Sequence, residues 1–379
     1  MDIVLDIARL QQNKYGEELC GDTIEIARAG EHSVIVLADG LGSGVKASIL
    51  SSLTAKMACT MLKHGEELES VIECLAHTLP VCRVRHLAYS TFTIVSARGR
   101  LVYLAEYDNP PAIISDGLET RLLLLRQREL EGKTVKERFF ELLPGDWIVL
   151  VSDGVLHAGI GGVWNLGWGF ERVKAYIKSN LNPCDTAAEW AWDLMHVVEK
   201  LYGGKPGDDA SLVVLRARER RHCLVLTGPP ADRRDDARVL RILGEAPGWK
   251  IVAGGSTSNM ISRLTGERLE VDLSSDSSSV PPMGRMPGVD LVTEGVITLS
   301  HAAEKLGMFP RELRSKRDGA SQLAFRLLLS DDIHFVVGTA RNPALDSQEL
   351  AQFSSRSQVV GRIAEKLREQ GKSVKVDYV

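Results

Sequence analysis

The segment Val34-Ile35-Val36-Leu37-Ala38-Asp39-Gly40-Leu41-Gly42-Ser43-Gly44 joins an apolar run to an aspartate and a glycine-rich turn. The run is too continuous for a half-exposed strand, so we predict a strand that is covered on both faces. The glycines after Asp39 allow a tight turn and a close backbone approach to whatever the carboxylate binds. A helix is predicted over 44–62, with Ser43 as its N-cap, because apolar residues recur at every fourth position. These residues are Val45, Ile49, Leu53, Met57 and Met61.

Acidic residues recur at the ends of other predicted strands. They are Asp22, Asp153 in a second Asp-Gly turn, and the pair Asp208-Asp209. A buried carboxylate is costly unless a cation or a donor meets it, and Mg²⁺ and Mn²⁺ prefer oxygen ligands. Two such ions can hold a bridging hydroxide and clamp a phosphate. We therefore predict a shared metal site whose ligands are Asp22, Asp39, the carbonyl of Gly40, Asp153 and Asp208. The alternative is that each acid is only a turn residue, since Asp-Gly is common in turns.

The composition is that of an ordinary globular protein, with 44% hydrophobic and 25% charged residues among 379. A chain of this length is expected to form two domains. The net charge of −4 gives no reason to expect nucleic acid or an anionic membrane as a partner. No apolar run approaches the roughly 20 residues that span a bilayer, and the acidic N-terminus does not look like a signal peptide. Six scattered cysteines fit a reducing cytoplasm rather than a zinc site or a disulfide framework.

The order of predicted elements differs between the two halves. Residues 1–218 alternate strands, two helices, many strands, two helices and a last strand, which predicts two antiparallel sheets flanked by helix pairs. Within them, the segments 2–10 and 22–29 are expected to pair, and 139–143 and 146–152 to form a hairpin around Pro144-Gly145.

A charged segment over 216–222 marks a boundary. Beyond it, over 222–379, strands and helices alternate, which predicts a smaller α/β domain with a largely parallel sheet. A strand is expected over 269–273, a serine-rich loop over 274–279 and a helix over 350–370.

Several motifs resemble those of metal-dependent type 2C protein phosphatases, in particular the bacterial branch typified by stage II sporulation protein E and the stress-response sigma-factor regulators. They are Cys20-Gly21-Asp22, Ala38-Asp39-Gly40-Leu41-Gly42-Ser43-Gly44, Asn109-Pro110-Pro111-Ala112, Val151-Ser152-Asp153-Gly154-Val155 and Gly207-Asp208-Asp209-Ala210. The resemblance implies an αββα sandwich over 1–218 and hydrolysis of phosphoserine or phosphothreonine with two Mn²⁺ or Mg²⁺ ions. Its implied substrate is a phosphorylated signalling protein of the anti-anti-sigma (STAS) type.

The resemblance also assigns roles to single residues. Asp22 and Asp39 would touch both metals, and Gly40 would offer its carbonyl. Asp153 and Asp208 would complete the site, with Asp209 serving a second shell or a third ion. The arginine with which eukaryotic relatives bind phosphate has no clear match, and Arg9 is the candidate. His157 could act as an acid near the leaving oxygen, or be a loop histidine without a role.

The second half contains the turn Gly254-Gly255-Ser256-Thr257 between a strand and a helix. Unpaired N–H groups and the helix dipole favour an anion there, so we predict a small anionic ligand, with Arg263 and Arg341 to neutralise its charge. The alternative is an ordinary glycine turn. Two rival functions stay open as well: a catalytically silent binding module with the phosphatase fold, and a regulatory half of a protein whose main activity lies in 222–379.

Overall fold

The structure is a computed structural model that describes residues 3–78, 90–272, 283–340 and 356–379. The chain separates into two compact units, Met1–Glu219 and Arg220–Val379, which we call unit 1 and unit 2. The predicted serine-rich loop 274–279, the last residue of the strand expected over 269–273 and the first residues of the helix expected over 350–370 lie outside the described residues.

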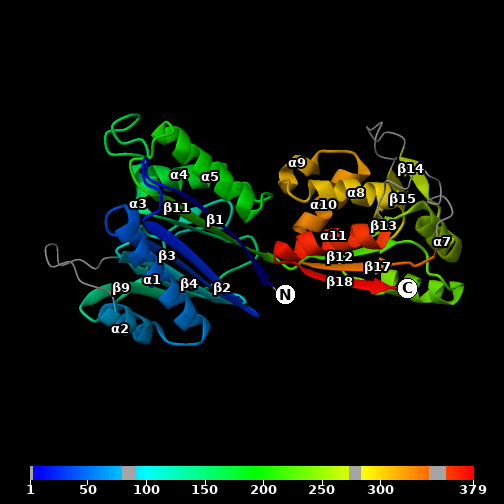
Figure 1. Ribbon diagram of the computed structural model, residues 1–379, viewed down its shortest axis with the longest axis horizontal. Helices are drawn as coiled ribbons and strands as arrows, with labels where there is room; N and C mark the ends of the chain where they lie inside the picture. Colours follow the sequence, from blue (N-terminus) through cyan, green and yellow to red (C-terminus); the bar gives the residue numbers. More distant parts are fainter. Residues whose placement is uncertain (1–2, 79–89, 273–282, 341–355) are drawn as a thin grey trace. The chain divides into compact units, whose positions relative to one another are not determined.

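Unit 1 contains two antiparallel sheets, as the sequence predicts. The first has the order β1 (Ile3–Gln12), β11 (Ala210–Glu219), β10 (Trp147–Val151), β6 (Ile113–Ser115) and β7 (Thr120–Arg121). The second has the order β2 (Asp22–Ala29), β3 (His32–Gly40), β4 (Ser90–Arg98), β5 (Leu101–Tyr107), β9 (Lys133–Glu141) and β8 (Arg126–Leu130). Figure 1 shows α4 and α5 on one side of these sheets and α1 and α2 on the other. The helices are α1 (Gly44–Lys63), α2 (Leu68–Thr78), α3 (Asp153–His157), α4 (Phe170–Asn180) and α5 (Ala187–Tyr202).

Strand β3 is covered on both faces, which confirms the expectation from its apolar run. Ile35 and Leu37 join the core between the two sheets. Val34 and Val36 pack instead into the core under α1 and α2. All four side chains are fully buried. Strand β3 therefore contributes to both cores, the one between the two sheets and the one between its sheet and the helices, as expected for a strand in an inner layer of an αββα sandwich.

Two predicted strand pairings are wrong. β1 pairs with β11 and β2 with β3, so the first two strands lie in different sheets. Likewise β9 pairs with β5 whereas β10 pairs with β11, so the turn at Pro144-Gly145 crosses between sheets instead of closing a hairpin. Leu143 N–H donates to the Asp146 carboxylate over 2.8 Å, which stabilises this crossing turn.

Helix α1 forms where it is predicted, but part of its apolar stripe faces solvent. Val45 is 62% exposed and Ile49 53% exposed, whereas Ala47 and Ala55 are fully buried. The face toward the sheet therefore consists largely of small residues, which let the helix axis approach closely. Ser43 stands at the N-cap, but its hydroxyl donates to the Glu17 carboxylate over 3.3 Å rather than capping the helix.

Unit 2 is built on one seven-stranded sheet that is largely parallel, as predicted. Its order is β14 (Glu270–Asp272), β15 (Met283–Met286), β16 (Val289–Thr293), β13 (Trp249–Ala253), β12 (His222–Thr227), β17 (Asp332–Val337) and β18 (Ser373–Tyr378). The pairings among β16, β13, β12, β17 and β18 are parallel, and β14 and β15 add an antiparallel edge.

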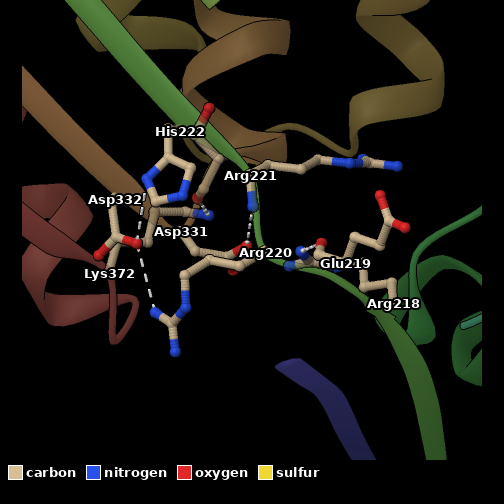
Figure 2. Close-up of polar contacts among 9 residues, drawn as sticks. Arg218, Glu219, Arg220, Arg221, His222, Asp331, Asp332 and Lys372 are labelled. Atoms are coloured by element: carbon tan, nitrogen blue, oxygen red, sulfur yellow. Dashed lines mark hydrogen bonds and ion pairs between the residues drawn. The ribbon is translucent and has the colours of Figure 1, made fainter. Parts of the chain in front are cut away.

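Helices cover both faces of this sheet. One face packs against α8 (Val296–Lys305), α9 (Pro310–Arg314), α10 (Gly319–Leu329) and α11 (Arg356–Glu369), and the other against α6 (Asp236–Glu245) and α7 (Gly255–Thr265). The last residues of the charged segment expected as a boundary are anchored within unit 2. Arg220 lies 3.3 Å from the Asp332 carboxylate, and Arg221 N–H donates to Asp331 over 2.9 Å (Figure 2).

The part of the chain that the structure describes has no helix long and apolar enough to cross a membrane.

Candidate functional site

The predicted metal ligands come from both sheets of unit 1 and gather at one end of them. Asp22 and Asp39 are direct partners across the β2–β3 pair. Asp153 begins α3 directly after β10, and Asp208 precedes β11, the neighbour of β10. A cavity of about 630 Å³ is lined by Asp39, Gly40, Asp153 and Asp208 among other residues.

The acids at this end of the sheets repel one another. Burial and then the neighbouring Asp22 and Asp153 raise the pKa of Asp39 to about 9. Burial is also the main reason why the pKa of Asp22 is raised, with Asp209 and Asp153 adding to it. A cation between these groups would favour the charged forms of Asp22 and Asp39.

Buried oxygen atoms provide the test of whether divalent ions fit here. Asp22 is 4% exposed and Asp209 3% exposed, and each has an Oδ2 atom without a hydrogen-bond partner among the described residues. Ligand atoms of Asp153, His157 and Asp208 lie within 4.8 Å of one another. This end of the sheets offers several carboxylate oxygens as ligands, which suits Mn²⁺ or Mg²⁺.

Asp209 is fixed by a loop that is distant in the sequence. Its Oδ1 accepts from the Lys14 N–H over 3.0 Å, and its Oδ2 is the buried oxygen without a hydrogen-bond partner among the described residues. Asp208 lies 3.5 Å from His157 Nδ1, so the histidine is a neighbour of the acidic group rather than an unrelated loop residue.

Two glycines are required by close backbone approaches. A Cβ at Gly40 would lie 2.3 Å from the carbonyl oxygen of Ala47 on α1. A Cβ at Gly154 would lie 2.0 Å from the carbonyl oxygen of Asp209. Both distances are too short for any side chain, so each Asp-Gly turn packs directly against another backbone segment of the site.

Lys14 is a site residue that sequence reasoning missed. It lines the cavity, and its Nζ lies 3.5 Å from the Ser43 hydroxyl. Arg9, the candidate for binding phosphate, does not line this cavity, and its guanidinium donates to the Ile24 carbonyl over 2.5 Å. Lys14 lies in a polar segment without periodicity, so the sequence did not indicate that it belongs to the site.

The Asn-Pro-Pro loop is held near the same cavity, which Tyr107 and Asp108 line. Asn109 donates from its side-chain amide to the Thr93 hydroxyl over 2.9 Å. The buried Glu106 carboxylate accepts from the Ala112 N–H over 2.7 Å, and burial raises the pKa of Glu106. These two bonds fix both ends of the loop.

The turn predicted to bind an anion lies at the carboxyl end of β13. Gly254 is the N-cap of α7 and offers no side chain, and Thr257 is fully buried with an unpartnered hydroxyl among the described residues. The expected counter-charges are not arranged for an anion. Arg263 forms an ion pair with Asp236 at 3.0 Å, and Arg341 lies outside the described residues.

Comparison with known proteins identifies the family of unit 1. The profile of the stage II sporulation protein E (SpoIIE) family matches residues 29–218. No curated protein matches the chain.

Solved structures that are similar to this chain include the following three. A SpoIIE phosphatase domain with a regulatory fragment, from Bacillus subtilis, is 20% identical with a TM-score of 0.49, over 57% of this chain and 64% of that one. The RsbU and RsbW domains of a Mycobacterium tuberculosis protein are 17% identical with a TM-score of 0.46, over 64% and 67%. RsbX in complex with magnesium is 19% identical with a TM-score of 0.42, over 56% and 95%. This chain thus spans less than two thirds of the first of these structures.

Proposed function

Because the chain belongs to the stage II sporulation protein E family of type 2C protein serine/threonine phosphatases, we propose that unit 1 hydrolyses phosphoserine or phosphothreonine on a signalling protein. One observation carries the proposal: carboxylates from four separate chain segments crowd one end of two sheets, where burial and mutual repulsion raise the pKa of Asp39. An arrangement this unfavourable for the ion-free chain is explained by a need to bind cations.

We assign the metal-binding role to Asp22, Asp39, the Gly40 carbonyl, Asp153 and Asp208. Mn²⁺ or Mg²⁺, the ions that type 2C phosphatases use, would supply Lewis-acid stabilisation and an activated water when bound there. Asp209 serves the site indirectly, because it joins the Lys14 segment to the acidic group.

Other residues of the chain bind and orient the phosphate-bearing substrate. Lys14 provides a positive charge in the wall of the cavity, where it can meet a phosphate oxygen. Tyr202 donates to the Gly154 carbonyl over 2.5 Å and so fixes the second Asp-Gly turn. His157, beside Asp208, is placed to hold a proton for the leaving oxygen, because its imidazole is 44% exposed and faces the acids.

The protein substrate that we propose is a phosphorylated anti-anti-sigma protein of the STAS type, on the basis of the resemblance to regulators of stress-response sigma factors. The proposed location is the cytoplasm, where the free thiols of Cys59 and Cys223 would be stable. We also retain the small anionic ligand at Gly254, Gly255, Ser256 and Thr257 as a proposal, supported by the buried hydroxyl of Thr257.

The proposed activity is tested with a phosphothreonine peptide and the full chain, with Mn²⁺, with Mg²⁺ and in excess chelator. We expect turnover with either ion and none in chelator. Asp39→Asn should lower turnover by at least about a hundredfold, since it removes a charged ligand. Glu171→Gln is the matched control, because this carboxylate is 79% exposed on α4 and should leave turnover unchanged. Full activity in chelator would refute the metal-dependent mechanism, and inactivity of the wild type with both ions would favour the silent binding module.

A further inference from the structure

A basic pocket lies in unit 2 between the β15–β16 edge and the turn that joins α9 to α10. Its volume is about 290 Å³. Five of its lining residues are cations, and they are Arg285, Arg314, Lys316, Arg317 and Arg326. Among the described residues that line it, Asp290 alone is acidic. Such a concentration of positive charge is unexpected in a chain whose net charge is −4.

Three of these cations come from the end of α9 and the turn that follows it, and this turn is rigidly held. The side-chain amide of Gln322 donates to the Lys316 carbonyl over 2.6 Å and to the Arg314 carbonyl over 3.3 Å. Asp318 caps α10 by accepting from the Ser321 N–H over 2.8 Å. The cations therefore project from a backbone that does not need to be ordered when a ligand binds.

Arg326 lies on α10 and lines the pocket. Its guanidinium donates to the side-chain oxygen of Gln322 over 2.8 Å. Its Nε is buried without a partner among the described residues, and burial lowers the pKa of Arg326. A guanidinium in such surroundings attracts an anion more strongly than one in water does.

Structural needs account for only part of this charge. Cations at the end of a helix stabilise its dipole, but α9 has five residues and requires few of them. Arg285 and Arg326 come from other elements, β15 and α10. Cations from three elements that face one hollow are better explained by a ligand.

We propose that this pocket binds a small molecule that carries one or more phosphate groups. Guanidinium groups match phosphate oxygens in geometry and charge. The volume suits a phosphate and the group attached to it, and it is too small to bury a longer chain. The proposal is independent of the catalytic site of unit 1.

The basic pocket is a stronger anion site than the glycine turn of α7. At that turn, the Glu294 carboxylate lies 3.7 Å from the position of a Cβ on Gly255. Arg263 is already paired with Asp236. A multiply charged anion would meet a negative group at the turn and several positive groups in the pocket.

The test uses the full chain and isothermal titration with inorganic pyrophosphate in excess chelator, so that no divalent ion recruits the anion to the acids of unit 1. Lys316→Glu/Arg317→Glu reverses two exposed charges in the pocket. Arg238→Glu/Arg241→Glu is the matched control, because it makes the same charge change on exposed positions of α6. Gly255→Asp tests the glycine turn. Unfolding temperatures are measured for every variant, and Lys316→Ala/Arg317→Ala replaces the first variant if it does not fold.

We expect saturable binding by the wild type, a loss of affinity of at least about tenfold in the pocket variant, and less than about a twofold change in the control and in Gly255→Asp. An equal loss in the pocket variant and the control would show non-specific attraction and overturn the proposal. A loss in Gly255→Asp alone would move the ligand to the turn. No binding by the wild type would also overturn the proposal, while leaving the phosphatase activity of unit 1 untouched.

Discussion

Removing metal ions should make unit 1 less stable as the pH rises. In the ion-free folded chain the pKa of Asp39 is about 9, against an ordinary value of 3.8, because of burial and the neighbouring acids. Between these values the folded chain holds a proton that the unfolded chain has lost. Stability is therefore greatest at low pH and falls as the pH rises toward the folded value.

The size of the effect follows from one retained proton. Each pH unit changes the free energy of unfolding by about 1.4 kcal/mol, so about three units, from roughly pH 5.5 to roughly pH 8.5, remove about 4 kcal/mol. For a unit of this length that corresponds to a fall of roughly 8–16 °C in the unfolding temperature. Asp22, whose pKa is raised to about 7, adds to the fall in the lower part of the range.

Differential scanning calorimetry in excess chelator measures this fall, and three chains separate its causes. Asp39→Asn has no charge to lose at this position, so its unfolding temperature should fall much less and should exceed that of the wild type near pH 8.5. Glu171→Gln should behave like the wild type, because its carboxylate is exposed. Added Mn²⁺ should remove the fall, since the ion binds the folded chain alone. A flat wild-type profile in chelator, or an equal fall in Asp39→Asn, would refute the crowding of acids as we describe it.

Two further predictions concern residues around the acids. Lys14→Met should lower kcat/KM for a phosphothreonine peptide by roughly tenfold or more, because a charged contact with phosphate is lost, whereas Lys56→Met on the exposed side of α1 should not change it. Steady-state kinetics at saturating Mn²⁺ decide this, and equal values for the two variants would remove Lys14 from the site. Gly154→Ala should lower the unfolding temperature and abolish turnover, because its Cβ would lie 2.0 Å from the Asp209 carbonyl oxygen. Gly162→Ala, where the nearest atom is at 3.7 Å, is its control, and similar unfolding temperatures would contradict the close approach.

The acidic part of the site could be predicted from the sequence because its signal is local. A carboxylate at the end of a buried strand needs a reason. Asp39 is the second-last residue of such a strand, and Asp153 follows another after Ser152. Lys14 gave no comparable signal, since its place depends on contacts with residues far along the chain. Tyr15 N–H donates to the Pro206 carbonyl over 2.8 Å, and Lys14 N–H to Asp209.

Fold class could be predicted for the same reason, and strand partners could not. The spacing of apolar residues distinguishes strands from helices, and the order of these elements along the chain indicates the layers. Two antiparallel sheets in unit 1 and a mostly parallel sheet in unit 2 were predicted in this way. The turn at Pro144-Gly145 has the chemistry of a hairpin, yet β9 and β10 belong to opposite sheets. Local turn chemistry does not distinguish a hairpin from a crossing between sheets, because the chain reverses its direction in both. The two cases differ only in which strands pair with the segments before and after the turn.

Helix α1 shows how the site constrains packing at a distance from its acids. The apolar stripe led us to expect a buried face, but Val45 and Ile49 are exposed while alanines face the sheet. Gly40 explains the inversion, because the carbonyl of Ala47 lies where its Cβ would be. Only small residues allow α1 to come this close to the Asp39-Gly40 turn. The helix thus packs tightly against a predicted metal ligand and leaves apolar side chains exposed to water. Stability alone does not favour such an arrangement.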